Sequence, residues 1–320
     1  MQILQHAGPG IYTLDSGYVR PRFDAIHLVE HAGRVALVDT ATTHSVPLVM
    51  SALAELGLAA EAVDWILLTH VHLDHAGGAG ALMQALPNAR LAVHPRGARH
   101  MIDPTVLWAS TVQVYGQDFA RRAYGEVLPA PATRVVEATD GLHIDLAGRV
   151  LEVADTPGHA RHHVCYYDAL SRGWFTGDTF GLSYRQLDAG GRAFVFPTTT
   201  PIQFDPQALH ASIDRLSARE PVCMFLTHYG RVEGVPRLAA DLQRLIDAMV
   251  AIAHAAQDLP EHPRLAALRA GLCELVREES RHSGWALRGD AAAELLADDI
   301  ELNAQGLSVW IENQRKKNNA

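Results

Sequence analysis

Cysteine is scarce in this chain of 320 residues, which contains only Cys165, Cys223 and Cys273. Two of them fall in apolar, strand-like runs, where a cysteine usually acts as a small buried hydrophobic residue. An odd and sparse set of this kind does not provide a disulfide framework. We therefore expect a reduced, cytoplasmic protein.

Long hydrophobic runs and basic stripes are also missing. No run reaches the roughly 18 apolar residues that a membrane-spanning helix needs, and no basic stretch followed by an apolar segment marks a secretory signal. The net charge of −9 argues against a nucleic-acid scaffold. We expect a small-molecule substrate, with no nucleic acid or membrane as partner, and we leave self-association into a homo-oligomer open.

The composition is typical of a globular protein. Apolar residues make up 48% of the chain and charged residues 20%, so a sizeable core can form. A length of 320 residues allows one large domain with an extension, or two domains.

The most informative segment holds four potential metal ligands within six residues, His70, His72, Asp74 and His75. They directly follow a predicted strand at 65–69. Imidazole nitrogen and carboxylate oxygen are ligands that zinc and neighbouring first-row metals accept. A chance surface cluster is the alternative, but a strand end gives little structural reason to crowd these groups together. The segment therefore predicts a metal site.

Three further candidates each follow an apolar, strand-like run: His159, Asp178 and His228. Taken singly, each is more often a cap or a hydrogen-bonded core group. Taken with the first cluster, they complete a set large enough for two metal ions. Ends of buried strands, and the loops after them, are where reactive groups gather.

The order of these motifs resembles the metallo-β-lactamase fold superfamily over roughly residues 10–245. The resemblance implies an α/β fold, a four-layer αββα sandwich, with a catalytic domain at 1–245. From about residue 236 the apolar spacing becomes helical, and no metal or nucleotide motif is present there. We therefore predict a C-terminal helical extension at 246–320, packed on the core or on a second subunit.

The resemblance also implies how the ligands divide. One metal would be held by His70, His72 and His159. The other would be held by Asp74, His75 and His228, with Asp178 bridging the two. Zinc is the expected metal, with iron or manganese as alternatives. An early Asp39 resembles the family residue that supports the ligands from behind.

The implied chemistry is hydrolysis. Metal coordination lowers the pKa of water from ~15.7 to about 7, so a metal-bridging hydroxide is a strong nucleophile, and Asp74 can also shuttle a proton. We predict a hydrolase of an ester, thioester or lactone, similar to glyoxalase II and the acyl-homoserine lactonases. The alternative is an oxidoreductase similar to the persulfide dioxygenases, with a single iron. A metal-binding protein without catalysis is a third option.

Substrate contacts are expected from the irregular segment after Asp178. We predict that Tyr184 lines the mouth of the site and hydrogen-bonds a substrate oxygen. The alternative is an exposed loop whose tyrosine packs on the surface. His162 and His163 are predicted to support the site or pack beside it. Residues 97–126 predict one or two helices that either cover the site or simply pack on the core.

Overall fold

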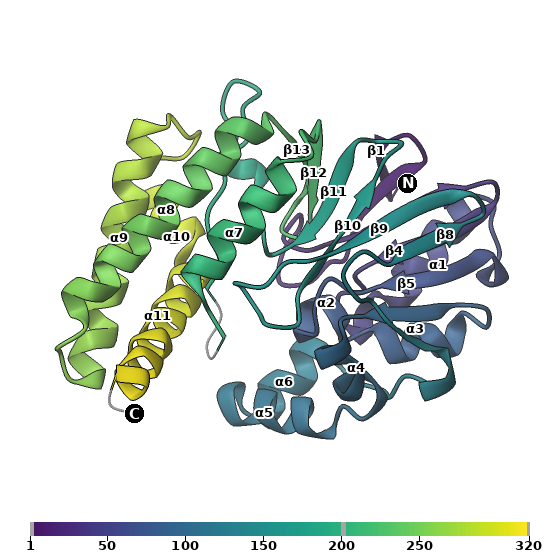
Figure 1. The fold of residues 1–320 in the computed structure, drawn as a ribbon, viewed down its shortest axis with the longest axis horizontal. Helices are drawn as coiled ribbons and strands as arrows, with labels where there is room; N and C mark the ends of the chain where they lie inside the picture. The colour runs from purple at the N-terminus through teal and green to yellow at the C-terminus, as the bar shows by residue number, and fades with distance from the viewer. Residues whose placement is uncertain (1–2, 200–202, 319–320) are drawn as a thin grey trace. The chain divides into compact units, whose positions relative to one another are not determined.

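The structure, a computed structural model, describes residues 3–199 and 203–318. The chain divides into two compact units (Figure 1). The first comprises Met1–Asp155, His162–Gly177 and Pro221–Val232, and the second comprises Thr156–Arg161, Asp178–Glu220 and Glu233–Ala320. The predicted boundary after residue 245 falls inside the continuous helix α8 (Val235–Ala256), so the chain is divided at other positions.

The first unit contains a seven-stranded sheet in sequential order. Its strands are β1 (Leu4–Gly8), β2 (Ile11–Asp15), β3 (Ala25–His31), β4 (Arg34–Val38), β5 (Val63–Leu67), β6 (Arg90–Val93) and β7 (Val135–Glu137). Strands β1 to β4 pair antiparallel, and β4 to β7 pair parallel. Parallel neighbours need crossover connections, and two of these contain the helices α1 (Val46–Glu55) and α3 (Ala79–Ala85).

The same unit contains a six-stranded sheet in the order β13-β12-β11-β10-β9-β8. Its strands are β8 (His143–Leu146), β9 (Arg149–Asp155), β10 (Val164–Asp168), β11 (Gly173–Gly177), β12 (Cys223–Leu226) and β13 (Gly230–Glu233). Strands β9, β10 and β11 lie side by side in Figure 1. Strand β12 joins β11 in parallel, which brings the end of a late strand beside an earlier one.

The core of the first unit lies between its two sheets. Buried residues such as Val29 and Leu67 from the first sheet pack with Val153, Tyr166 and Phe175 from the second. The other face of the first sheet packs against α1 and α3 in a separate buried cluster. Because both faces of the central strands are covered, strand β4 is buried from Val35 to Val38 and apolar over that stretch. The two sheets and their helices confirm the predicted α/β class.

Residues 95–124 form three helices where one or two were predicted: α4 (Pro95–Ile102), α5 (Thr105–Tyr115) and α6 (Gln117–Tyr124). They build a small apolar cluster outside the main core. Its buried members are Leu73, Ala120 and Tyr124, and the half-buried Tyr18 and Trp108 pack against them. Leu73 opens the short helix α2 (Leu73–Ala76), so this cluster lies on the segment that carries the predicted ligands. Short 3-10 turns occur at Thr43–Ser45, Ala60–Ala62, Ala132–Arg134 and Arg185–Leu187.

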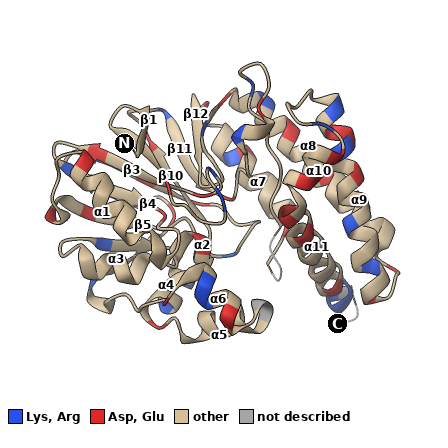
Figure 2. Cartoon of the chain, turned by 180° about the vertical axis from the view of Figure 1, so that it is seen from behind, with Lys and Arg blue, Asp and Glu red and all other residues tan. Residues whose placement is uncertain are grey.

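The second unit is mainly helical. Its helices are α7 (Pro206–Ser217), α8, α9 (Glu261–His282), α10 (Asp290–Leu295) and α11 (Ala297–Asn318). The Asp205 carboxylate accepts a hydrogen bond from the amide of Ala208 and so caps the start of α7. Helices α8, α9 and α11 pack on one another, and charges of both signs line α9 in Figure 2. The helical C-terminal region is therefore confirmed.

Two residues of types that often interrupt helices lie inside helices of the described part of the chain. Pro263 lies in the first turn of α9, where a missing amide hydrogen costs nothing, so it does not interrupt the helix. Gly306 lies inside the continuous helix α11. A Cβ on Gly306 would approach the carbonyl oxygen of Thr199 to 2.6 Å, so close packing accounts for glycine at this position.

Two further observations bear on the expected environment of the protein. Among the described residues, no helix combines the length and the apolar character needed to cross a membrane. Cys165 and Cys223 are buried, Cys273 is half-buried, and all three are free thiols.

His27 makes the stability of the first unit pH-dependent. Its ring is fully buried on β3, with Nδ1 3.2 Å from Oγ1 of Thr13 and Nε2 3.0 Å from the carbonyl oxygen of Leu226. Burial lowers the pKa of His27 from 6.5 to about 4, although the Leu226 carbonyl and Asp39 act in the opposite direction. Between about pH 6.5 and 4, His27 is therefore protonated in the unfolded chain but neutral in the folded chain. The contribution of neutral His27 to the free energy of unfolding is complete above about pH 6.5 and is lost as the pH falls through about 4.

We predict that His27→Gln flattens this loss, because glutamine can still donate to a carbonyl but does not titrate. The wild-type loss attributable to His27 is about 3 kcal/mol, at ~1.4 kcal/mol for each tenfold change in proton affinity. Urea unfolding of the metal-free protein between about pH 7.5 and 4 measures it. His143→Gln, at an exposed histidine of β8, is the matched control. Equal pH slopes for the wild type and His27→Gln would contradict the assignment.

Candidate metal centre

The segment that carries the first ligands is held from both sides by hydrogen bonds. Strand β5 ends at Leu67, and the chain runs on to His72, the residue before α2. The buried hydroxyl of Tyr166 donates to the carbonyl oxygen of Leu68 at 2.8 Å. The amide of Thr69 donates to Oδ1 of Asp39 at 2.8 Å. The backbone just before the ligands is therefore anchored in the core of the first unit.

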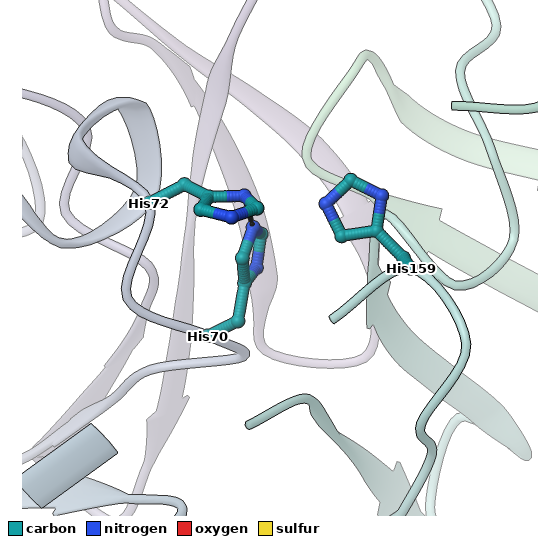
Figure 3. A group of neighbouring side chains, drawn as sticks. All are labelled: His70, His72 and His159. Carbon is teal, nitrogen blue, oxygen red and sulfur yellow. Dashed lines mark hydrogen bonds between the residues drawn. The ribbon is translucent and has the colours of Figure 1, made fainter. Parts of the chain in front are cut away.

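His70 and His72 direct nitrogen atoms toward each other. Their ring centroids are 4.3 Å apart with an interplanar angle of 86°. Figure 3 draws the two rings next to each other. Nε2 of His70 lies 2.6 Å from Nδ1 of His72. Nδ1 of His70 lies 3.2 Å from Oγ1 of Thr69, which leaves Nε2 facing its neighbour. Two nitrogens with lone pairs at one point suit a shared cation.

Asp74, His75 and His228 form a converging group in the same unit. Their ligand atoms all lie within 4.8 Å of one another. Nε2 of His75 is 3.8 Å from Oδ2 of Asp74, and Nε2 of His228 is 3.5 Å from the same oxygen. One carboxylate and two imidazoles at a strand end and a helix start are a donor set that zinc accepts.

The far side of each imidazole in this group meets an oxygen acceptor. Nδ1 of His75 lies 2.8 Å from Oδ2 of Asp39, and Nδ1 of His228 lies 3.0 Å from the carbonyl oxygen of Phe23. An acceptor at Nδ1 places the proton there and leaves the lone pair of Nε2 directed at Asp74. This is the orientation that metal-ligating histidines require, so the residues present fit a metal ion.

Asp39 is the common support of these groups. Its side chain is fully buried at the end of β4. The carboxylate accepts hydrogen bonds from the amide and hydroxyl of Thr69, from the hydroxyl of Thr227 at 2.7 Å, and from His75. These contacts confirm the predicted supporting role of Asp39.

The second unit contributes its own pair of predicted ligands. Nε2 of His159 lies 3.3 Å from Oδ2 of Asp178, and both side chains are buried. Nδ1 of His159 lies 3.0 Å from the hydroxyl of Thr198, so its Nε2 is again the atom that faces the carboxylate. His159 is the third histidine drawn in Figure 3. Gly158 has φ +137°, and a Cβ there would meet Cα of Leu209 at 2.4 Å, so the turn before His159 requires glycine.

Within the first unit the two sets of predicted ligands adjoin, because the ring centroids of His70 and His75 are 4.1 Å apart. The first unit holds the pair His70 and His72 and the group Asp74, His75 and His228. The second unit holds the pair His159 and Asp178. The assignment of all of them to one dinuclear centre stays a prediction.

His162 and His163 lie beside the ligands of the first unit. The ring of His163 is fully buried and stacks on His70, with centroids 4.9 Å apart. The ring of His162 lies edge-on to His72 at 5.6 Å. Gly177 leaves room for them, because a Cβ there would lie 2.7 Å from Nε2 of His163. These contacts agree with the predicted packing role.

Tyr184 is the residue predicted at the mouth of the site. Its side chain is fully buried in the second unit, and its hydroxyl donates to Oδ1 of Asp299 on α11 at 3.0 Å. Arg185 pairs with Asp188 at 3.1 Å, within its own turn. The alternative of an exposed loop is therefore wrong, because the C-terminal helix supplies a buried partner for the Tyr184 hydroxyl. Its position at the mouth of the site stays a prediction. Its catalytic role stays a prediction without support.

The loop between β2 and β3 contains site neighbours that the sequence pattern did not identify. Phe23 contacts the ring of His228 with centroids 5.4 Å apart. Asp24 is fully buried, and burial raises its pKa well above the usual range, although His228 and His75 oppose the shift. Burial, followed by the carboxylate of Asp74, raises the pKa of Tyr18 far above its usual value. In the sequence, these site neighbours are marked only by aromatic residues in a loop between two strands.

We predict that Asp39→Asn weakens metal binding by about 10- to 100-fold, the usual effect of losing a group that orients a ligand. An amide can present an NH₂ group where His75 and Thr227 need an acceptor, so the ligands lose their orientation. Competition with a chromogenic chelator measures the affinity. Asp64→Asn is the control, because Asp64 pairs with Arg34 at a half-exposed position. Wild-type affinity in Asp39→Asn would rule out the supporting role.

Tyr184→Phe separates the predicted catalytic role from the structural one. The variant loses a buried hydrogen bond to Asp299, so we expect unfolding to become easier by about 1–2 kcal/mol. A catalytic hydroxyl would instead lower turnover by about tenfold, equivalent to ~1.4 kcal/mol, without a change in stability. Urea unfolding and steady-state kinetics on the same preparation distinguish the two. A tenfold loss of turnover at unchanged stability would restore Tyr184 to the mechanism.

Comparisons with known proteins agree with this geometry. The family model of the metallo-beta-lactamase superfamily matches residues 19–228. A hydroxyacylglutathione hydrolase of Aeromonas hydrophila subsp. hydrophila is 32% identical over 194 residues, which cover 60% of this chain and 56% of that protein. The chain thus spans about half the length of the curated hydroxyacylglutathione hydrolases it matches.

Solved structures show the same fold. An archaeal metallo-beta-lactamase superfamily protein from Sulfolobus tokodaii superposes with a TM-score of 0.63 at 22% identity, covering 93% of this chain and 98% of that one. A metallo-beta-lactamase family protein from Thermus thermophilus gives a TM-score of 0.65 at 23% identity, with coverage of 97% and 94%. The predicted fold class is confirmed. With the family model matched across most of the two-sheet unit and all the predicted ligands, the chain belongs to the metallo-beta-lactamase superfamily.

Proposed function

We propose that this protein is a metal-dependent hydrolase of an ester, thioester or lactone. The observation that carries the proposal is the convergence of Asp74, His75 and His228, with the far nitrogen of each histidine held by an oxygen acceptor. Membership of the superfamily supports it, as does the similarity to proteins named hydroxyacylglutathione hydrolase. The cytoplasmic location stays a prediction.

We further propose a dinuclear centre. His70 and His72 would hold one ion together with His159, and the converging group would hold the other, with Asp178 as the bridge. The pairing of His159 with Asp178 within the second unit supports the first half of this assignment, because a bridging carboxylate must lie beside a ligand of each ion and His159 belongs to the first. The order of the motifs along the chain supports it independently.

Bound ions of this kind supply a hydroxide nucleophile at neutral pH and polarise a carbonyl group. The chain's own residues orient the site. Asp39 holds His75, and Phe23 holds His228, so neither ring can turn during a reaction. The Asp74 side chain is 26% exposed, whereas that of His75 is fully buried. Asp74 is therefore the group best placed to pass a proton between solvent and a leaving group. We propose zinc as the metal, with iron or manganese as alternatives.

The metal content and the reaction are tested together. Protein purified without added metal is analysed for its metals, then assayed for hydrolysis of an ester, a thioester and a lactone, and for oxygen uptake. We expect two divalent ions per chain and hydrolysis without oxygen uptake. One iron per chain with oxygen uptake would contradict the hydrolase and support the dioxygenase-like alternative.

We predict that Asp178→Asn loses metal and most of its hydrolytic activity, because a neutral amide cannot balance two dications. Asp188→Asn is a matched control on the same irregular segment, at a half-exposed carboxylate that pairs with Arg185. Metal analysis after dialysis and initial rates measure both effects. Full activity with unchanged metal content in Asp178→Asn would remove the bridging role.

A further inference from the structure

An apolar cluster is anchored between two of the proposed ligands. Leu73 lies between His72 and Asp74 in the sequence, and its side chain is buried with Ala120 and Tyr124 of α6. Tyr18 from the β2–β3 loop and Trp108 from α5 pack against this cluster. The cluster therefore shares its backbone with the ligand segment of the first unit.

Stacked rings connect the same cluster to a third ligand. Tyr124 and Tyr18 stack with centroids 5.8 Å apart and an interplanar angle of 29°. Tyr18 in turn lies 5.9 Å from Phe23, and Phe23 lies 5.4 Å from the ring of His228. A continuous row of rings thus runs from α6 to the group that contains Asp74 and His228. We call Tyr18, Phe23, Trp108 and Tyr124 the aromatic wall.

The aromatic wall is only partly covered, unlike the core of the same unit. Tyr18, Phe23 and Trp108 are half-buried, whereas core residues such as Tyr166 and Phe175 are fully buried. Aromatic side chains that keep part of their surface in water gain free energy when an apolar group covers them. Beside a partly exposed ligand such as Asp74, that apolar group would belong to a bound substrate.

The hydroxyl of Tyr18 adds a polar point to this surface. This hydroxyl hydrogen-bonds the side chain of Tyr124, on which the Tyr18 ring also stacks. On its other side Tyr18 contacts Phe23, which contacts His228. Tyr18 therefore lies between the ligand group and the apolar cluster of α6, where a polar reacting group would meet an apolar tail.

We propose that the aromatic wall binds an apolar acyl group of the substrate, and that Tyr18 and Trp108 determine the preference for acyl length. The inference rests on the proposed hydrolase function and specifies its substrate class as esters or thioesters of apolar acids. The competing possibilities are a wall that only packs the helices, a polar substrate, and a surface that binds a second copy of the chain.

Binding of product analogues tests the wall without requiring turnover. Acetate, butyrate, hexanoate and octanoate are titrated calorimetrically into the metal-loaded protein. We expect the affinity to rise with length, by at most about fourfold for each methylene buried, since a buried methylene contributes ~0.8 kcal/mol. Trp108→Ala should flatten this dependence, and Leu170→Ala, at an exposed turn of the same unit, should leave it unchanged. Equal affinities for all four acids in the wild type would overturn the proposal.

Kinetics on p-nitrophenyl acetate, butyrate and hexanoate then show whether the aromatic wall contacts the substrate or only supports the metal ligands. Tyr18→Ala should lower kcat/KM for the hexanoate by about tenfold, mainly through KM, and change the acetate less than threefold. Tyr18→Phe keeps the ring and should retain the length preference. Thermal unfolding checks that each variant is folded. A loss of equal size for every ester would show that the wall supports the ligands without touching the substrate, and would overturn the proposal.

The two assays distinguish failure of this inference from failure of the proposed function. Hydrolysis of all esters with no dependence on acyl length would contradict acyl binding by the aromatic wall and would leave the hydrolase function supported. Length-dependent binding of the acids without hydrolysis of any ester, thioester or lactone would contradict the hydrolase function and would leave acyl binding by the aromatic wall supported. A change from monomer to dimer at higher concentration that abolishes length-dependent binding would assign the surface to a second copy and overturn the acyl site.

Discussion

The buried carboxylate of Asp39 is the interaction on which the site depends. It lies at the end of β4 and accepts hydrogen bonds from Thr69, Thr227 and His75. These partners follow β5, follow β12 and belong to α2, so one side chain joins strand ends from both sheets. A buried anion is tolerated only when donors compensate for its lost hydration. Each donor is therefore required, and the strand ends cannot shift independently.

This constraint sets the direction of the ligands themselves. Thr69 is followed by His70, and Thr227 is followed by His228, so each threonine bound to Asp39 fixes the backbone directly before a ligand. His75 is oriented directly. The aromatic wall has a different origin, because its residues come from the β2–β3 loop and from helices α5 and α6.

The sequence predicted the parts of this site that depend on local pattern. A strand, a turn residue and a ligand form a short motif, and β12 followed by His228 matches it. The failures have a common cause in long-range contact. Tyr184 is buried because Asp299, far away in the sequence, accepts its hydroxyl hydrogen bond. Likewise, α11 continues through Gly306 because Thr199 packs against it. No periodicity or spacing encodes such partners, and the same holds for Tyr18.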